Sequence, residues 1–290
     1  MSRHPTQPRR LLNAKCLYCA EQFSAEKPKT KEHVIGRRFV PTGALYQCWN
    51  LIVNACARCN NLKADLENDL SVITMLPPLG EQLSPELANE AQRRARRSSS
   101  RRTRRPVADS QETMEIKIAA APNAIFTFNM VAPPQADSSR VNLLSLMHMQ
   151  AFFYMITYSY ETRLGGYWLG KFDVTDSARR PDWGNPRQRA FAASVEAWPH
   201  RLIVNTANGH FKAMIRRKPN AEVWAWALEW NKGLRNVGYF GEEESLRSEL
   251  ARLPEMHMQE IRNDNGNMVR FRVEESLSEE NDALFNIDRG

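Results

Sequence analysis

Hydrophobic and polar positions alternate along much of the second half of the chain, a pattern typical of β-strands. The alternation predicts strands over residues 114–119, 124–131, 167–174, 201–205 and 210–216, and a hairpin of residues 256–262 and 268–273. Pro122-Asn123 and residues 263–266 are turn sequences between two of these pairs. The pattern therefore predicts at least two antiparallel hairpins.

Other segments carry helix signals. Ser84 and Pro85 are typical of an N-cap and of the first residue of a helix. Apolar spacing predicts further helices over residues 141–160, 190–198 and 242–253. The alternating tryptophans from Trp224 to Trp230 fit a strand, but two of them also fit a helix, so this segment stays open. Together these elements predict an α+β domain over residues 111–290.

The length and composition are those of an ordinary globular protein. The chain has 290 residues, of which 42% are hydrophobic and 25% charged, which excludes a fibrous or wholly disordered protein. Polar residues interrupt the most apolar stretch, residues 141–160, so we predict a buried helix and no membrane span. The first residues contain no apolar signal-peptide region, so we expect a cytoplasmic protein with reduced cysteines.

Positive charge is concentrated toward the N-terminal end. Residues 1–110 carry a net charge of +9 and residues 241–290 one of −7, a gradient that fits a polyanionic partner but also simple solvation. Residues 93–105 include eight arginines, among them Arg93, Arg94, Arg96 and Arg97. Because like charges repel, we predict an unpacked linker over residues 81–110, either a phosphate-gripping arm or a solvated tether.

Two pairs of cysteines are the strongest chemical signal. Cys16 and Cys19 form one C-x-x-C pair, and Cys56 and Cys59 form a second pair 36 residues later. Each pair can bend through a tight turn, so that four thiolates meet at the corners of a tetrahedron. The spacing therefore predicts a structural zinc site that also contributes folding energy. Cys48 fits neither pair, and we expect a half-buried side chain without a metal.

Polar residues follow a defined order between and after these pairs. Glu32 and His33 come first, Asn50 follows, Asn60 directly succeeds the second cysteine pair, and Lys63 lies three residues further on. In this order and spacing, the stretch resembles the HNH endonucleases of the four-cysteine type, whose core is a ββα-metal fold. The resemblance covers roughly a fifth of the chain, and the remainder resembles no family in this way.

The resemblance implies an organisation and a set of roles. Residues 1–80 would form an HNH nuclease domain with structural zinc, followed by the linker and a larger α+β domain. In the family pattern, the catalytic divalent metal, Mg²⁺ or Mn²⁺, is held by Glu32 and Asn60. The family's remaining roles fall on His33 as the general base, Asn50 as the residue that orients this histidine, and Lys63 as a phosphate contact.

The chemistry of phosphodiester hydrolysis requires these residue types whether or not the family resemblance holds. A histidine of ordinary pKa, about 6.5, supplies a neutral base for the attacking water. Carboxylate and amide oxygens suit hard divalent cations, which neutralise the charge of the transition state. We therefore predict a metal-dependent endonuclease acting on DNA, with RNA as an open alternative. Arg37 and Arg38 would contact the nucleic acid together with Arg93, Arg94, Arg96 and Arg97, although these arginines and Lys63 equally fit solvated surface charge.

Two positions depart from the family pattern, and one rival interpretation stays open. Asn60 stands where histidine is frequent, and Gly36 stands where proline is common, which would loosen the loop after His33. The rival is a non-catalytic zinc module that binds nucleic acid or protein, although a zinc site with a purely structural role does not need this whole set of polar residues. The role of the C-terminal domain stays open between recognition and formation of a homodimer that turns nicks into double-strand breaks.

Overall fold

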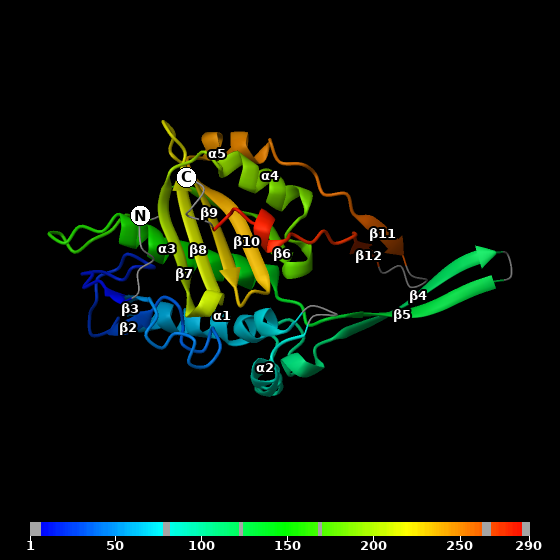
Figure 1. The fold of residues 1–290 in the computed structure, drawn as a ribbon. Helices are drawn as coiled ribbons and strands as arrows, with labels where there is room; N and C mark the ends of the chain where they lie inside the picture. The colour runs from blue at the N-terminus through cyan, green and yellow to red at the C-terminus, as the bar shows by residue number, and fades with distance from the viewer. Residues whose placement is uncertain (1–6, 78–81, 122–123, 168–169, 263–267, 286–290) are drawn as a thin grey trace.

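The protein has a mixed α+β fold with one small and one large sheet in its body (Figure 1). The computed structural model describes residues 7–77, 82–121, 124–167, 170–262 and 268–285. The predicted turns at Pro122-Asn123 and residues 263–266 lie outside the described residues. The α+β class expected from the sequence is confirmed.

A three-stranded sheet and one long helix form the N-terminal part. β3 (Leu51–Cys56) lies in the middle of this sheet, parallel to β1 (Arg9–Arg10) and antiparallel to β2 (Lys29–His33). α1 (Ala57–Met75) follows β3 without a loop, so Asn60 lies in its first turn. β2 ends at the predicted histidine, which places that residue beside the start of α1.

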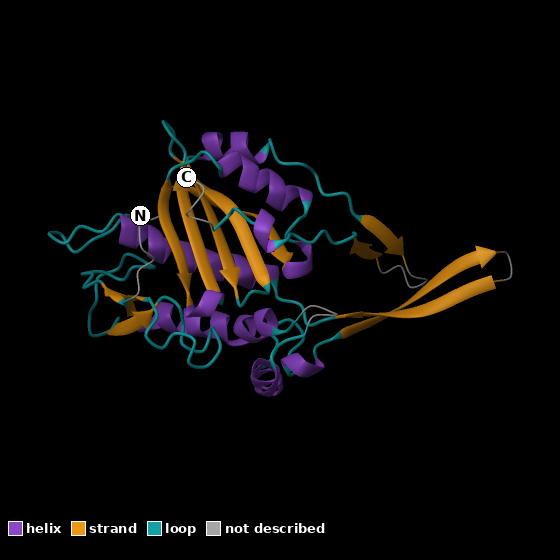
Figure 2. Cartoon of the chain, in the orientation of Figure 1, coloured by secondary structure: helices purple, strands orange, loops and turns teal. Residues whose placement is uncertain are grey.

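The larger sheet has five antiparallel strands with helices on both faces. Its order is β6 (Lys171–Arg179), β10 (Leu234–Gly241), β9 (Val223–Trp230), β8 (Phe211–Arg217) and β7 (His200–Thr206). Separate clusters of buried side chains line its two faces. The elements around it are α3 (Ser138–Ile156) on one face and α4 (Pro186–Val195) and α5 (Glu243–Leu250) on the other (Figure 2).

The tryptophan-rich segment, β9, is a strand with two buried faces. Its three tryptophans and Leu228 pack in the core on the α3 side, whereas Ala225 and Ala227 pack on the side of α4 and α5. All eight residues are buried. This period of two is that of a strand, because successive side chains point to opposite faces. Large side chains on one face and small ones on the other settle the choice that the sequence left open.

Two strands of the large sheet differ from the expectations. The sequence pattern does not predict β10, because Asn236, Gly238 and Gly241 interrupt its apolar positions. Gly238 is required by packing, since a Cβ atom there would overlap the Trp226 ring. β6 begins four residues after the start of the strand predicted over 167–174 and continues five residues beyond its predicted end.

The other predicted elements are present with shifted ends. α3, α4 and α5 overlap the three helices expected from apolar spacing. The two hairpins are formed by β4 (Glu112–Ala121) with β5 (Ala124–Ala132), and by β11 (Gln259–Arg262) with β12 (Met268–Phe271). The first of them projects from the body in Figure 1. No helix in the described part of the chain combines the length and the apolar character that crossing a membrane requires.

The arginine-rich segment, residues 93–105, is packed and differs from the linker that the sequence predicts. It begins within α2 (Pro85–Arg97), whose N-cap is Ser84 as expected, with its hydroxyl accepting a backbone hydrogen bond at 3.4 Å. Ala91 and Ala95 are buried, and Ala95 packs against apolar side chains of α1. Mutual repulsion does not prevent this packing, because α1 supplies acidic partners.

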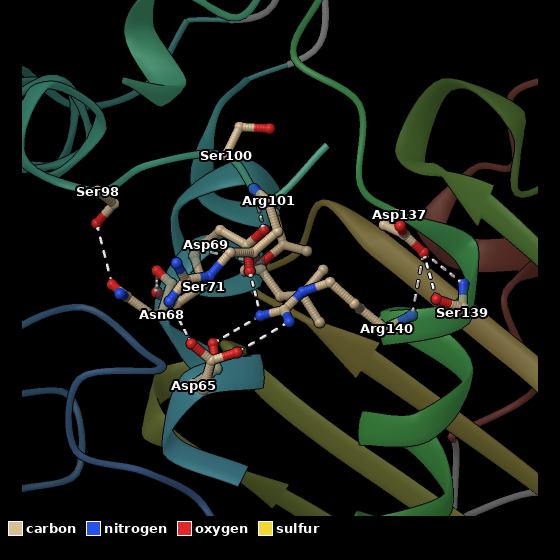
Figure 3. Close-up of polar contacts among 12 residues, drawn as sticks. Asp65, Asn68, Asp69, Ser71, Ser98, Ser100, Arg101, Asp137, Ser139 and Arg140 are labelled. Carbon is tan, nitrogen blue, oxygen red and sulfur yellow. Dashed lines mark hydrogen bonds and ion pairs between the residues drawn. The ribbon is translucent and has the colours of Figure 1, made fainter. Parts of the chain in front are cut away.

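Figure 3 shows these partners, Asp65 and Asp69, one turn apart on α1. Arg140 of α3 donates hydrogen bonds to both carboxylates at 2.9 Å. The backbone N–H of Arg101 donates to Asp69 at 3.1 Å, and its guanidinium pairs with Asp65. One network of charges thus joins α1, α3 and the chain that follows α2.

Replacement of Arg140 by alanine should destabilise the protein by about 3 kcal/mol, because it removes the charged partner of the Asp69 carboxylate, whose side chain is 2% exposed. Chemical denaturation of the variant and the wild type measures this difference. Arg102→Ala is the matched control, since its pair with Glu112 is about half exposed on both sides and should contribute less than about 1 kcal/mol. Equal losses from the two variants would contradict the role given to the network.

The N-terminal part and the large sheet share one hydrophobic core. Val34 and Phe39, from the loop after β2, lie in the same cluster of buried side chains as Phe152 of α3 and Trp230 of β9. The Phe39 ring centroid lies 5.4 Å from that of Trp230, in an edge-to-face arrangement. The residues beyond the arginine-rich segment therefore pack directly behind the loop that follows His33.

Candidate active site and metal cluster

The four cysteines predicted to bind zinc lie together. Cys16 and Cys19 flank a tight turn, Cys56 ends β3, and Cys59 lies in the first turn of α1. Their sulfur atoms all lie within 4.8 Å of one another, an arrangement that could hold a metal ion such as zinc. Cys48 is half-buried and lies outside this cluster, as expected.

The electrostatics of the cluster favour a bound cation. Burial and the charge of Cys16 raise the pKa of the Cys59 thiol well above its usual value. Such neighbouring thiols cannot all ionise at neutral pH unless a positive charge offsets their repulsion. A metal ion supplies that charge and displaces the thiol protons, so the donor set fits a tetrahedral metal of the zinc type.

A basic cleft of about 880 Å³ opens beside the end of β2. The end of β2, the loop that follows it, α1 and α2 all contribute to its wall. The polar residues that line this basic cleft include Lys31, Glu32, His33, Arg37, Arg38, Asn60, Glu67, Arg93, Arg94 and Arg97. The predicted base, both predicted oxygen ligands and five of the six predicted nucleic-acid-binding arginines therefore line one cleft.

His33 is half-buried at the edge of this cleft. Burial lowers the pKa of its imidazole, and the positive charges of Arg37, Lys31 and Lys63 lower it further. The ring is therefore neutral at neutral pH and has a lone pair free to take a proton. These are the properties required of a general base.

Glu32 and Lys63 form a buried ion pair beneath the cleft. The Lys63 Nζ atom lies 3.0 Å from Glu32 Oε1 and 2.5 Å from Glu67 Oε1, and its side chain is 1% exposed. Tyr18 donates a further hydrogen bond to Glu32 at 3.2 Å. Burial alone would lower the pKa of Lys63, but the charges of Glu67 and Glu32 outweigh it and raise the pKa, so the ammonium is retained.

Lys63 therefore differs from both expectations for it. It neither lines the cleft, where a phosphate would bind, nor extends into solvent. The reason is its position on α1, which directs it toward two carboxylates in the interior. Its contact with the carbonyl oxygen of His33, at 3.5 Å, gives it a different function, which is to support the backbone that carries the imidazole.

Asn50 and Asn60 both form hydrogen bonds, Asn50 with the backbone and Asn60 with a side chain of β2. Asn50 Oδ1 accepts a hydrogen bond from the N–H of Ile35 at 3.1 Å, and Asn50 Nδ2 donates to the carbonyl of Ile35 at 2.8 Å. Asn50 thus bonds to the loop two residues after His33, whereas the resemblance implied that it orients the histidine. Asn60 Nδ2 donates to Thr30 Oγ1 at 3.0 Å, so its amide oxygen is the atom that remains for a cation.

The predicted arginines divide into three groups. Arg37, Arg38, Arg93 and Arg97 line the cleft. Arg94 also lines it, but its guanidinium donates to the carbonyl of Arg38 at 2.6 Å and pairs with Glu90 at 2.5 Å, so it fastens the loop to α2. Arg96 is exposed and lies outside the cleft lining.

Two residues of this region, Glu67 and His148, were not expected from the sequence. Glu67 lies four positions after Lys63 on α1, a spacing that signals an ion pair on a helix. The apolar surroundings of His148 in the sequence give no such signal, because its approach to Glu67 is made only by the packing of α3 on α1.

Comparison with known proteins adds no family to this description. No family model matches the chain, and no curated protein or solved structure matches it either. The resemblance to HNH endonucleases therefore rests on the sequence motif alone, which lies between and directly after the cysteine pairs.

Proposed function

We propose that this protein is a metal-dependent endonuclease that hydrolyses phosphodiester bonds of DNA. The observation that carries the proposal is His33, a neutral and half-buried histidine at the edge of a basic cleft that Glu32 and Asn60 also line. The four-cysteine cluster would hold a structural zinc ion behind the same strands.

In this proposal, His33 accepts a proton from the water that attacks the phosphorus atom. Glu32 and Asn60 would hold a divalent cation, Mg²⁺ or Mn²⁺, which supplies positive charge to the developing phosphorane and the leaving oxygen. Three buried groups lie at this point: Glu32 and Glu67 carry negative charge when ionised, and Lys63 carries one positive charge. Burial raises the pKa of Glu32, and the charge of Lys63 opposes this rise. A cation would therefore be held by these carboxylates, and the basic lining of the cleft would be left for phosphate.

The arginines that line the cleft support a nucleic acid as the substrate. Arg37, Arg93 and Arg97 line two sides of the cleft, and guanidinium groups bind phosphate oxygens without reading the bases. Affinity from such contacts is largely independent of sequence and falls as salt is added. A nucleic-acid backbone is therefore the polyanion that we expect in this cleft.

We expect the purified protein to nick supercoiled plasmid DNA when Mg²⁺ or Mn²⁺ is present. A mild chelator that removes the weakly held cation should abolish nicking while zinc stays bound and the fold is kept, because sulfur ligands hold zinc far more tightly than oxygens hold Mg²⁺. Gel assays with and without added metal, paired with zinc analysis and circular dichroism, measure this. Parallel digestion of RNA and single-stranded DNA identifies the substrate. Nicking that persists without any divalent cation would contradict the proposal.

The pairing of Glu32 with Lys63 favours a second candidate, a zinc module that binds nucleic acid without cutting it. In that case Lys63 neutralises Glu32 permanently and the cleft needs no cation. The two candidates differ in one measurement. A binding module should shift DNA in a gel with no dependence on Mg²⁺ or Mn²⁺ and leave it intact, whereas the nuclease should cut it.

A further inference from the structure

The loop that carries the proposed base is held by side chains at three successive points. Lys63 contacts the carbonyl of His33 at 3.5 Å, and Asn50 bonds to both backbone groups of Ile35. The N–H of Gly36 donates a hydrogen bond to Glu67 Oε1 at 3.3 Å. Two of these three holding residues, Lys63 and Glu67, are themselves bonded to each other on α1.

Gly36 is adapted to the contact with Glu67. A Cβ atom at this position would overlap the Glu67 carboxylate, so any larger residue would displace it. Proline would also lack the N–H that Glu67 accepts. The departure of Gly36 from the family pattern therefore has a physical reason, which is the close approach of this carboxylate to the backbone.

His148 of α3 lies behind Glu67 in the shared core. It is fully buried, and its Nε2 atom faces Glu67 Oε1 at 3.8 Å. Neither ring nitrogen lies within ordinary hydrogen-bond distance of a partner in the described part of the chain, but the Glu67 carboxylate and the backbone of Val34 are the ring's polar neighbours. Burial lowers the pKa of His148 to about 4, so the ring is a neutral imidazole with one N–H to donate.

We propose that His148 is a positioning residue for the active site, acting through Glu67 on the backbone that follows His33. The inference rests on the proposed function, because it gives His148 a part in holding the base. The imidazole N–H directs the Glu67 carboxylate toward the N–H of Gly36 and the ammonium of Lys63. Glu67 then holds the loop at Gly36, and Lys63 contacts it at His33. Through this contact, α3 of the C-terminal part completes the site of the N-terminal part.

The aromatic surroundings of His148 allow this role to be separated from packing. Its ring makes edge-to-face contacts with Phe39, Phe211 and Trp230, at centroid distances of 5.2–5.7 Å. Phenylalanine keeps an aromatic ring among these neighbours and removes both nitrogens, although its six-membered ring is larger than imidazole. His148→Phe should therefore unfold close to the temperature of the wild type, because the loss of two polar atoms from the core offsets the tighter packing.

Hydrogen–deuterium exchange of the wild type, His148→Phe and Glu67→Gln tests the inference without reference to cutting. We expect faster amide exchange over residues 33–36 in both variants, with no such change in Phe152→Leu, which lies one turn further along α3 and weakens the core alone. His148→Gln, which keeps an N–H donor, should restore part of the protection. Unchanged exchange over residues 33–36 in His148→Phe would overturn the inference, whatever the protein cuts.

Nicking kinetics then link the position to the reaction. His148→Phe should lower kcat at least tenfold with little change in KM, and the double variant with Glu67→Gln should be no slower than Glu67→Gln alone, because both act through one carboxylate. Multiplied losses, or a kcat equal to that of the wild type, would overturn the positioning role. A wild type that shows no cutting with Mg²⁺ or Mn²⁺ would overturn the proposed function and the catalytic part of this inference, while the exchange data would still decide the contact itself.

Discussion

His33→Ala should reduce DNA nicking by about 10²–10⁴-fold, the range that a general base contributes to catalysis. The half-buried imidazole lines the basic cleft, its pKa is lowered, and its backbone is held on both sides. Removing the ring removes the proton acceptor but none of these supporting contacts, which all involve backbone groups. The variant should therefore keep the fold and the zinc content of the wild type and lose the reaction. Nicking rates under saturating Mg²⁺, with circular dichroism and zinc analysis on the same samples, measure both parts.

His257→Ala is the matched control for this substitution, because that histidine is exposed and lies outside the cleft lining. It should cut at the rate of the wild type. A His33→Ala protein that is folded and cuts as fast as the control would show that the water is activated by another group. Binding of DNA should change little in either variant, since the cleft arginines are untouched.

Cys56→Ala should remove zinc from the protein and unfold its N-terminal part. Cys56 is buried where β3 meets α1, so its sulfur holds the strand and the helix to the turn that carries Cys16. Structural zinc sites of small domains bind their metal with about 10–16 kcal/mol, as much as the whole stability of a typical protein, about 5–15 kcal/mol. Because the N-terminal part shares its core with the large sheet, the loss should spread beyond the cluster. Metal analysis and thermal unfolding check this.

Cys48→Ala provides the comparison, since Cys48 is half-buried and lies apart from the four-sulfur cluster. It should retain one zinc per chain and lose less than about 1 kcal/mol of stability. If Cys56→Ala kept the zinc content and the unfolding temperature of the wild type, the cluster would not be a structural metal site. Nicking activity should be lost with the zinc in Cys56→Ala and kept in Cys48→Ala, because the end of β2 and the start of α1 both belong to the cleft.

Local patterns were sufficient for much of the fold and for the centre of the candidate site. The two cysteine pairs predicted a cluster that the structure brings together, and Glu32, His33 and Asn60, predicted to share one site, line one cleft. Short turns, caps and alternating strands act over a few residues, so the sequence carries their signals directly. The hairpins and the cap at Ser84 were found for the same reason.

Contacts between distant segments could not be predicted in this way. The arginine-rich segment was expected to stay unpacked, yet Asp65 of α1 pairs with the guanidinium of Arg101 and Asp69 accepts a hydrogen bond from the backbone of Arg101. Lys63 was expected at the phosphate or in solvent, yet it lies between two buried carboxylates. In each case, one partner carboxylate comes from another element: Asp65 of α1 pairs with Arg101, and Glu32 of β2 pairs with Lys63.

By itself, the sequence determined where four sulfur donors, one histidine and a basic segment occur, and which short elements carry them. Only the tertiary structure decided that β9 is buried on both faces, that Lys63 supports the backbone of the histidine, and that His148 reaches the site from a separate helix. The physical reason is that residue type and spacing govern local conformation, whereas burial and ion pairing depend on which surfaces the whole chain brings together.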